Sequence, residues 1–105
     1  MPRHLFVVYT NAVAGREHEY NDWYKGQHVA DLLACPGVVS ARRFELAEQQ
    51  LNDKPAAFKY LALYEVETDD PQSFLNEITT RAGTANMPIT AALAQDAHAV
   101  LWKAL

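Results

Sequence analysis

The chain has 105 residues, of which 50% are hydrophobic, and this composition is typical of one globular domain, which we expect to span residues 1–105. The formal net charge of -4 and the pI of about 5.4 argue against a nucleic-acid partner, because binding a phosphate backbone needs a basic surface. We expect no membrane segment, because no apolar run reaches the roughly 18 residues that a spanning helix needs. The amino terminus shows no signal peptide and Cys35 is the single cysteine, which together predict a cytoplasmic protein.

The first strand is expected at residues 5–9 (LFVVY), an apolar run without polar alternation that indicates a strand covered on both faces. Three later segments have strand patterns, at residues 38–46, 59–66 and 98–103. In the second of the four strands, Arg42 and Arg43 are expected to point to opposite faces, since side chains alternate along a strand. The polar residues 47–55 between the second and third strands predict an exposed hairpin loop.

Residues 16–33 (REHEYNDWYKGQHVADLL) carry two apolar stripes that one straight helix cannot bury against one sheet. Tyr20, Trp23 and Tyr24 form the first stripe, and the second one consists of Val29, Leu32 and Leu33. We therefore expect a break at Lys25-Gly26, followed by a short second helix. This arrangement turns His28 and Asp31 away from the core, toward either solvent or a cavity.

A further helix is expected to begin at Asp70, a side chain suited to an N-cap, with Pro71 in its first turn. Its buried stripe would be Phe74, Leu75 and Ile78, and it should end near residue 81. Residues 82–96 are expected to be irregular, with one helical turn around residues 90–94.

The predicted order of strand, helix, strand, strand, helix, strand is typical of an α+β, ferredoxin-like βαββαβ fold, in which two helices cover one face of a four-stranded antiparallel sheet. The other face would be bare and apolar, and such patches usually mark association surfaces. We therefore expect a homodimer whose sheets pack face to face, with a pocket for a hydrophobic small-molecule ligand inside the resulting barrel or at its mouth.

The segments LFVVYTN, GREHEYNDWY, GQHVADLL and CPGVVSARRFEL together resemble the EthD-like and DUF4286-like proteins of the dimeric α+β barrel superfamily. The most specific features are the spacing W-Y-x-x-x-H-x-x-D and the turn and strand P-G-x-x-x-A-x-R-F; beyond residue 46 only the order of elements matches. The resemblance implies a ferredoxin-like protomer, a dimer and cofactor-independent small-molecule metabolism. Relatives in the superfamily include polyketide cyclases, muconolactone-type isomerases and cofactor-free monooxygenases.

His28 is the first catalytic candidate, because an imidazole can give or take a proton near neutral pH. Asp31 follows one helical turn later, where its carboxylate could orient the imidazole and raise its basicity. The plainer interpretation is a surface histidine with an incidental neighbour.

Trp23, Tyr24, Tyr64 and Arg43 are the candidate substrate-binding residues. Aromatic residues on a helix, such as Trp23 and Tyr24, belong more often to the hydrophobic core than to a ligand-binding surface. A buried phenol such as that of Tyr64 needs a polar partner, which a substrate oxygen could supply. Arg43 could bind a carboxylate or phenolate, although an ion pair with a glutamate or with a residue across the dimer is the commoner use of such an arginine.

His4 is a second candidate, because in polyketide cyclases of the superfamily a histidine near this point serves the active site. We expect no metal site, since the four histidines His4, His18, His28 and His98 are scattered and none pairs with another at helical ligand spacing. No phosphate loop, nucleophile elbow or cysteine nucleophile is indicated, so we expect no cofactor.

Two functions remain open at this point. In the first, the protein is a cofactor-independent enzyme of isomerase, cyclase or lyase type that performs proton-transfer chemistry on a hydrophobic, aromatic or polyketide-like molecule. In the second, it is an accessory or ligand-binding dimer of a catabolic or biosynthetic pathway, with the same pocket and no turnover. A purely structural dimer without a pocket is a third possibility.

Overall fold

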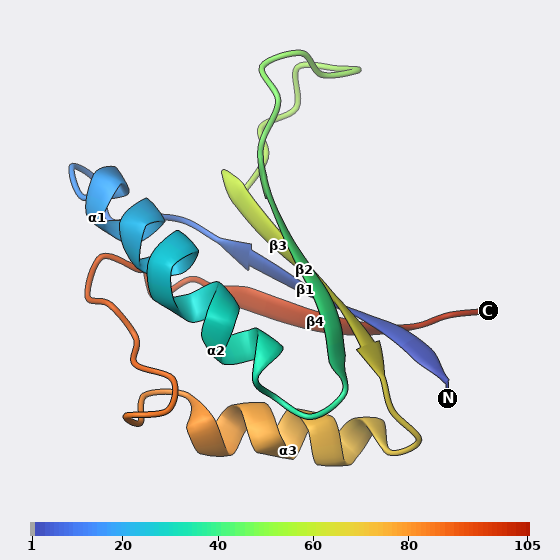
Figure 1. The fold of residues 1–105 in the computed structure, drawn as a ribbon. Helices are drawn as coiled ribbons and strands as arrows, with labels where there is room; N and C mark the ends of the chain where they lie inside the picture. Colours follow the sequence, from blue (N-terminus) through green and yellow to red (C-terminus); the bar gives the residue numbers. More distant parts are fainter. Residues whose placement is uncertain (1) are drawn as a thin grey trace.

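The computed structural model describes residues 2–105 and consists of a sheet with helices on one side (Figure 1). The elements in chain order are β1 (Arg3–Thr10), α1 (Glu17–Trp23), a π-helical turn (Tyr24–His28), α2 (Val29–Leu33), β2 (Val38–Glu45), β3 (Tyr60–Glu67), α3 (Pro71–Arg81) and β4 (His98–Lys103). The predicted βαββαβ order is therefore confirmed, and each predicted strand differs from the observed one by at most two residues at either end.

The four strands pair in the order β2-β3-β1-β4, and every pairing is antiparallel. In the central pair Phe6 lies opposite Tyr64, and Val8 lies opposite Ala62. Arg43 lies opposite Ala62 and Arg42 opposite Leu63, so the two arginines do point to opposite faces. This is the topology of the ferredoxin-like fold.

The helices cover one face of this sheet, and the core lies between the two layers (Figure 1). Along β3 the side chains alternate strictly, with every second residue from Tyr60 to Val66 buried beneath the helices. Phe6 joins them from β1 and packs edge to face against Phe74 of α3, with ring centroids 5.3 Å apart. Burying apolar and aromatic area on this face is the main force that fixes the strand register.

The helical arm from Glu17 to Leu33 does not break at Lys25-Gly26, contrary to the prediction. Gly26 lies inside the π-helical turn, and only Gly15, Gly37 and Gly83 have positive φ angles among residues 2–105. A π turn holds one extra residue, which rotates the following helix by about 100° without a chain break. That rotation lets Tyr20 and Tyr24 share the buried face of the arm with Leu32, while Leu33, expected in the core, is 44% exposed.

Helix α3 begins as its sequence predicts. The Asp70 carboxylate accepts a hydrogen bond from the Ser73 backbone N–H at 3.1 Å, and Pro71 occupies the first turn. Phe74 is fully buried, while Leu75 and Ile78 are partly buried against the core. An N-cap of this kind stabilises a helix by about 1 kcal/mol.

Residues 82–97 contain no helix, and the helical turn expected at residues 90–94 is a single hydrogen-bonded turn, in which the Leu93 N–H donates to the Thr90 carbonyl at 3.3 Å. The stretch is instead held by backbone pairing: Leu93 forms an isolated bridge with Ala12, and the Val13 N–H donates to the Ala92 carbonyl at 2.7 Å. Met87 from the same stretch is buried in the core. Contacts with the loop before α1 thus take the place of a local helix.

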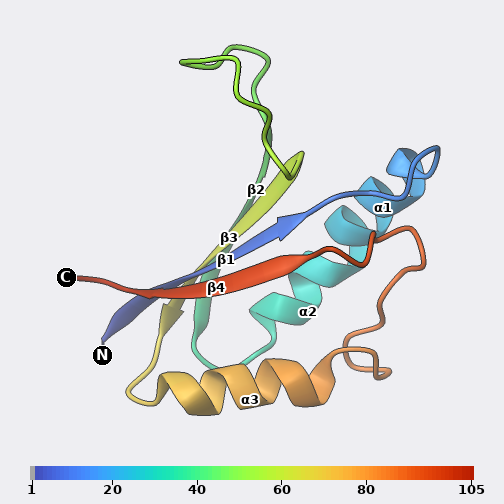
Figure 2. The ribbon, with the colours of Figure 1, turned by 180° about the vertical axis from the view of Figure 1, so that it is seen from behind.

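The second face of the sheet is covered by no helix, as Figure 2 shows from behind. It carries large apolar side chains that are partly exposed, including Leu5, Phe44 and Trp102, and Trp102 is 56% exposed. Residues 46–59 connect β2 to β3 and project well beyond the sheet (Figure 1). Within residues 2–105, none of the helices has the length and apolar character needed to span a bilayer.

Candidate functional site

His28 is positioned by the π-helical turn of the arm. The Val29 N–H donates to the Tyr24 carbonyl across five residues, which is the hydrogen bond that defines the turn. The His28 ring stacks on Trp23 with centroids 4.4 Å apart and meets the edge of Tyr24 at 4.9 Å. Two aromatic rings therefore hold the imidazole in one orientation. The sequence pattern had predicted only that His28 points away from the core.

His28 lines a small cavity of about 150 Å³ between the sheet and the helices. Its walls come from β1, β3, β4, the helical arm, α3 and the segment after α3, and they are almost entirely apolar. The lining residues are Phe6, Val8, His28, Leu32, Tyr64, Ile78, Ala82, Met87, Ile89 and Ala99. Besides the His28 imidazole, the polar side chain in this set is the Tyr64 phenol.

The Nδ1 atom of His28 is buried, and no hydrogen-bond partner for it exists among residues 2–105. Burial lowers the pKa of His28 to about 4, and the negative charge of Asp31 opposes this effect only in part. The imidazole is therefore neutral at pH 7. A buried polar atom without a partner costs free energy, so a ligand that bonds to it would gain that energy on binding.

Asp31 does not hydrogen-bond to His28. Both of its carboxylate oxygens accept from the Gln27 side-chain amide at 3.0 Å, and Asp31 is only half-buried. Its link to the imidazole is electrostatic, because its charge raises the pKa of His28 against the larger effect of burial. The carboxylate can thus stabilise a protonated His28, although it does not fix the ring.

Tyr64 and Tyr24 form a buried pair whose hydroxyl oxygens are 3.2 Å apart. Burial raises the pKa of Tyr24 to about 12 and that of Tyr64 still further, so both phenols are protonated at neutral pH. Each hydroxyl has one proton, and their mutual hydrogen bond uses one of the two. The second proton remains available for a hydrogen bond, and Tyr64 is one of the residues that line the cavity.

Trp23 does not line the cavity, although it supports the His28 ring. Its indole N–H donates to the Pro88 carbonyl at 3.0 Å, which ties the arm to the segment that contributes Met87 and Ile89. Tyr24 likewise forms part of the second layer, behind Tyr64 and His28. Both residues contact the residues that line the cavity.

Arg43 lies on the other side of Tyr24, in a separate cleft, and does not reach the cavity. Its guanidinium stands over the Tyr24 ring at 4.5 Å and donates to the Asn21 Oδ1 at 2.8 Å. Arg43 forms no ion pair with either glutamate: Glu45 pairs with Lys59, and Glu65 lies on the opposite face of the sheet, where it pairs with Arg3.

His4 is buried on the helix-facing side of β1, opposite Val66 and Lys103, and does not border the cavity. Its Nδ1, like that of His28, has no partner within the described residues. Residues 2–105 contain no group of three potential metal ligands.

A larger hollow of about 370 Å³ opens beside the base of the hairpin and is lined mainly by Tyr9, Phe44, Phe58 and Leu61. Its two charged residues, Glu45 and Lys59, are already within 3.8 Å of each other. We regard the smaller cavity as the candidate site, because a fixed, unpartnered imidazole and a phenol converge there.

Sequence reasoning missed most of the apolar walls of the cavity. Met87 and Ile89 lie in an irregular segment that carries no periodic pattern, so no sequence signal placed them near His28. Phe6 and Val8 could have been found, because they share a strand face with His4. The site as a whole combines an apolar pocket of about 150 Å³ with a neutral histidine and a tyrosine in its wall.

No protein-family profile matches the sequence, and no curated protein matches it. Solved structures match the fold over nearly the whole chain. A proposed monooxygenase from Shewanella loihica PV-4 has a TM-score of 0.64 and 11% identity, with 100% of this chain and 97% of that chain covered.

The heme degrader MhuD from Mycobacterium tuberculosis, solved with two hemes in its active site, also has a TM-score of 0.64, with 14% identity and coverage of 97% and 95%. An EthD family protein from Bacillus halodurans C-125 has a TM-score of 0.53, with 11% identity and 100% coverage of both chains. The chain therefore has the ferredoxin-like α+β fold that its sequence predicts, and the resemblance to EthD-like proteins is confirmed at the level of fold.

Proposed function

We propose that the protein binds a small hydrophobic molecule in the His28 cavity and catalyses proton transfer on it without a cofactor. One observation carries this proposal: His28, whose neutral imidazole has a buried and unpartnered Nδ1, lines an otherwise apolar cavity that Tyr64 also borders. Perturbed titratable groups in concave pockets are typical of active sites. The fold neighbours, an enzyme of heme degradation and a proposed monooxygenase, support a small-molecule role for this fold.

The size of the cavity indicates the size of the ligand. A dry apolar cavity of about 150 Å³ in another protein accommodates benzene. At about 150 Å³ the His28 cavity therefore suits one six-membered ring or a lactone of similar size. A hydroxyl on such a ring could donate to the imidazole nitrogen, and a carbonyl oxygen could accept from the Tyr64 hydroxyl.

In the proposed chemistry, His28 accepts a proton from the bound molecule and returns it at another atom, as an isomerase, cyclase or lyase requires. The neutral imidazole is the form that can accept a proton, and burial keeps His28 in that form. The Asp31 carboxylate stabilises the imidazolium that forms through its charge. Tyr64 donates a hydrogen bond to the oxygen on which negative charge develops.

The heme bound by MhuD does not fit this cavity. A porphyrin contains four pyrrole rings, whereas about 150 Å³ accommodates one aromatic ring. His28 is the imidazole beside this pocket, but a pocket of that volume is smaller than the macrocycle.

The same cavity also supports ligand binding without turnover, and the low pKa of His28 favours this second function. An imidazole with a pKa of about 4 is a weak base, since efficient general bases have pKa values near the working pH. In an accessory protein His28 would serve only as a hydrogen-bond acceptor. In either function we propose a cytoplasmic homodimer that pairs through the uncovered sheet face around Trp102.

The test compares two histidines of the same helical arm. His28→Gln removes the imidazole in the cavity, and His18→Gln removes a fully exposed one that pairs with Asp22. Melting temperatures are measured with a panel of phenols, aromatic acids and lactones, and turnover of each stabilising compound is followed by NMR. The enzyme function predicts that His28→Gln abolishes turnover while His18→Gln leaves it unchanged. Stabilisation without turnover in the unaltered protein would establish the binding function, and a panel without any effect would refute both.

A further inference from the structure

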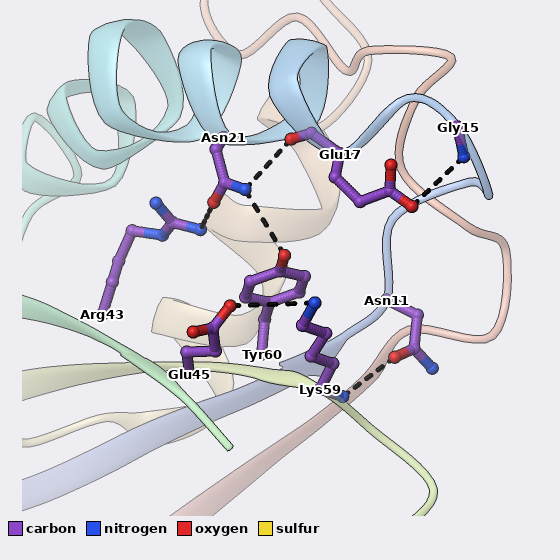
Figure 3. Close-up of polar contacts among 8 residues, drawn as sticks. All are labelled: Asn11, Gly15, Glu17, Asn21, Arg43, Glu45, Lys59 and Tyr60. Atoms are coloured by element: carbon purple, nitrogen blue, oxygen red, sulfur yellow. Dashed lines mark hydrogen bonds and ion pairs between the residues drawn. The ribbon is translucent and has the colours of Figure 1, made fainter. Parts of the chain in front are cut away.

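A third hollow of about 290 Å³ lies between α1 and the adjoining ends of β2 and β3, and it shares no residue with the His28 cavity. Its lining residues are Asn21, Arg43, Phe44, Glu45 and Tyr60. Figure 3 shows Arg43 reaching up from its strand toward Asn21 of α1, with Tyr60 beside them. We call this hollow the Arg43 cleft.

The Arg43 guanidinium is held in place by three contacts. It stands over the faces of Tyr24 at 4.5 Å and Tyr20 at 5.5 Å, and its Nη2 donates to Asn21 Oδ1 at 2.8 Å. Cation–π contacts and a fixed hydrogen bond leave the guanidinium little freedom. Its position is therefore set before any ligand arrives.

Asn21 is itself oriented by two hydrogen bonds. Its Nδ2 donates to the Glu17 backbone carbonyl at 3.0 Å and to the Tyr60 hydroxyl at 3.4 Å (Figure 3). The Tyr60 hydroxyl accepts in this bond, so its own proton remains free to donate into the cleft. Arg43 and Tyr60 thus present N–H and O–H donors to the same hollow.

The positive charge of Arg43 is not compensated within residues 2–105. No carboxylate lies within 4.0 Å of it, and the one acid lining the cleft, Glu45, is turned toward Lys59 at 3.8 Å (Figure 3). A guanidinium has five N–H donors, and the bond to Asn21 uses one of them. A half-buried arginine with spare donors and no counter-ion is suited to a planar anion, which it binds through two parallel hydrogen bonds.

We propose that the Arg43 cleft binds the carboxylate of a small organic acid, with Arg43 as the forked donor and Tyr60 as an additional donor. The cleft has one uncompensated positive charge, since Glu45 and Lys59 neutralise each other, and this matches a singly charged carboxylate. The site does not depend on the proposed function, because Tyr24 and Tyr64 separate it from the cavity.

The experiment is an NMR titration of the ¹⁵N-labelled protein with sodium benzoate, with neutral benzamide as the matched probe. We expect benzoate to shift the Asn21 side-chain amide and the Arg43 Nε–H in a saturable manner, and benzamide to leave both unchanged. Arg43→Gln should weaken benzoate binding at least tenfold. Arg42→Gln removes the neighbouring arginine on the opposite face of the strand and should leave the affinity unchanged.

Arg43→Lys keeps the positive charge but cannot form two parallel hydrogen bonds to a carboxylate, so it should bind benzoate with intermediate affinity. It replaces Arg43→Gln in the test if that variant fails to fold. Absence of shifts in the unaltered protein, or equal affinity after loss of Arg43, would overturn the proposal. Benzoate shifts confined to Ile78 and Met87 would also overturn it, because the acid would then occupy the His28 cavity. A parallel titration with phenol reports on that cavity alone, so failure of one site is distinguishable from failure of the other.

Discussion

Burial of neutral His28 makes the stability of the protein depend on pH in a defined window. The imidazole has a pKa of 6.5 in the unfolded chain and about 4 in the folded one, where desolvation penalises the charged form. Between these values the unfolded chain binds the proton and the folded chain does not. Stability therefore falls as the pH is lowered from 6.5, and the loss is complete below a pH of about 4.

The size of this loss of stability follows from the difference between the pKa values of His28 in the unfolded and the folded chain. A change from 6.5 to about 4 corresponds to about 3 kcal/mol of unfolding free energy between neutral and acid pH. This is a large part of the total for a small domain, which is typically 5–15 kcal/mol. Replacing His28 with Gln removes the titrating group, so the variant should lack this part of the pH dependence.

The assay is urea unfolding followed by circular dichroism at several values between pH 4 and pH 7.5. Acidic groups also titrate in this range, and the difference between the unaltered protein and His28→Gln isolates the contribution of the imidazole. His18→Gln is the control, because it removes an exposed imidazole from the same helical arm. If His28→Gln loses stability on acidification as steeply as the unaltered protein does, the imidazole is not buried in its neutral form and the reasoning is wrong.

Three further perturbations test the fold, the phenol pair and the association surface. Gly37→Ala should destabilise the protein by at least about 1 kcal/mol in urea, because Gly37 has φ +93° and a Cβ would lie 2.8 Å from a backbone oxygen; Gly15→Ala, at φ +82° in open space, should cost less. Tyr64→Phe should cost about 1–3 kcal/mol, since it leaves the buried Tyr24 hydroxyl without its partner, and unchanged stability would contradict that pairing. Trp102→Glu should yield monomers in sedimentation velocity if the uncovered face is the dimer interface, and a persistent dimer would place the interface elsewhere.

Most of the fold could be predicted because its signals are local. Strand patterns gave the four strands, Asp70 and Pro71 marked the start of α3, and the two-residue period separated Arg42 from Arg43. The sequence also showed that the arm must change face. It did not show by which structure the helix changes face, because Gly26 is compatible with both a chain break and a π-helical turn. The hydrogen bond from the Val29 N–H to the Tyr24 carbonyl shows that the structure has the π-helical turn.

The candidate site was predictable only in part, because its walls come from segments far apart in the chain. The aromatic spacing in the arm identified His28 with its neighbours Trp23 and Tyr24, which the structure brings into contact. The separation of Arg43 from the cavity, and the pairing of Asp31 with Gln27, depend on tertiary packing that periodicity does not encode. The functional roles of all these residues remain predictions.

The most direct test is an NMR titration with phenol in which two sets of signals are followed: the imidazole nitrogens of His28 and the methyl groups of Leu32, Ile78 and Met87. A ring-sized cavity with an unpartnered imidazole predicts that both sets shift together with one saturable binding curve. It also predicts that toluene, which lacks the hydroxyl, moves the methyl signals and leaves the Nδ1 signal nearly unchanged. If phenol moves neither set, or moves only residues on the uncovered face of the sheet, the cavity is not a binding site and the proposed function fails.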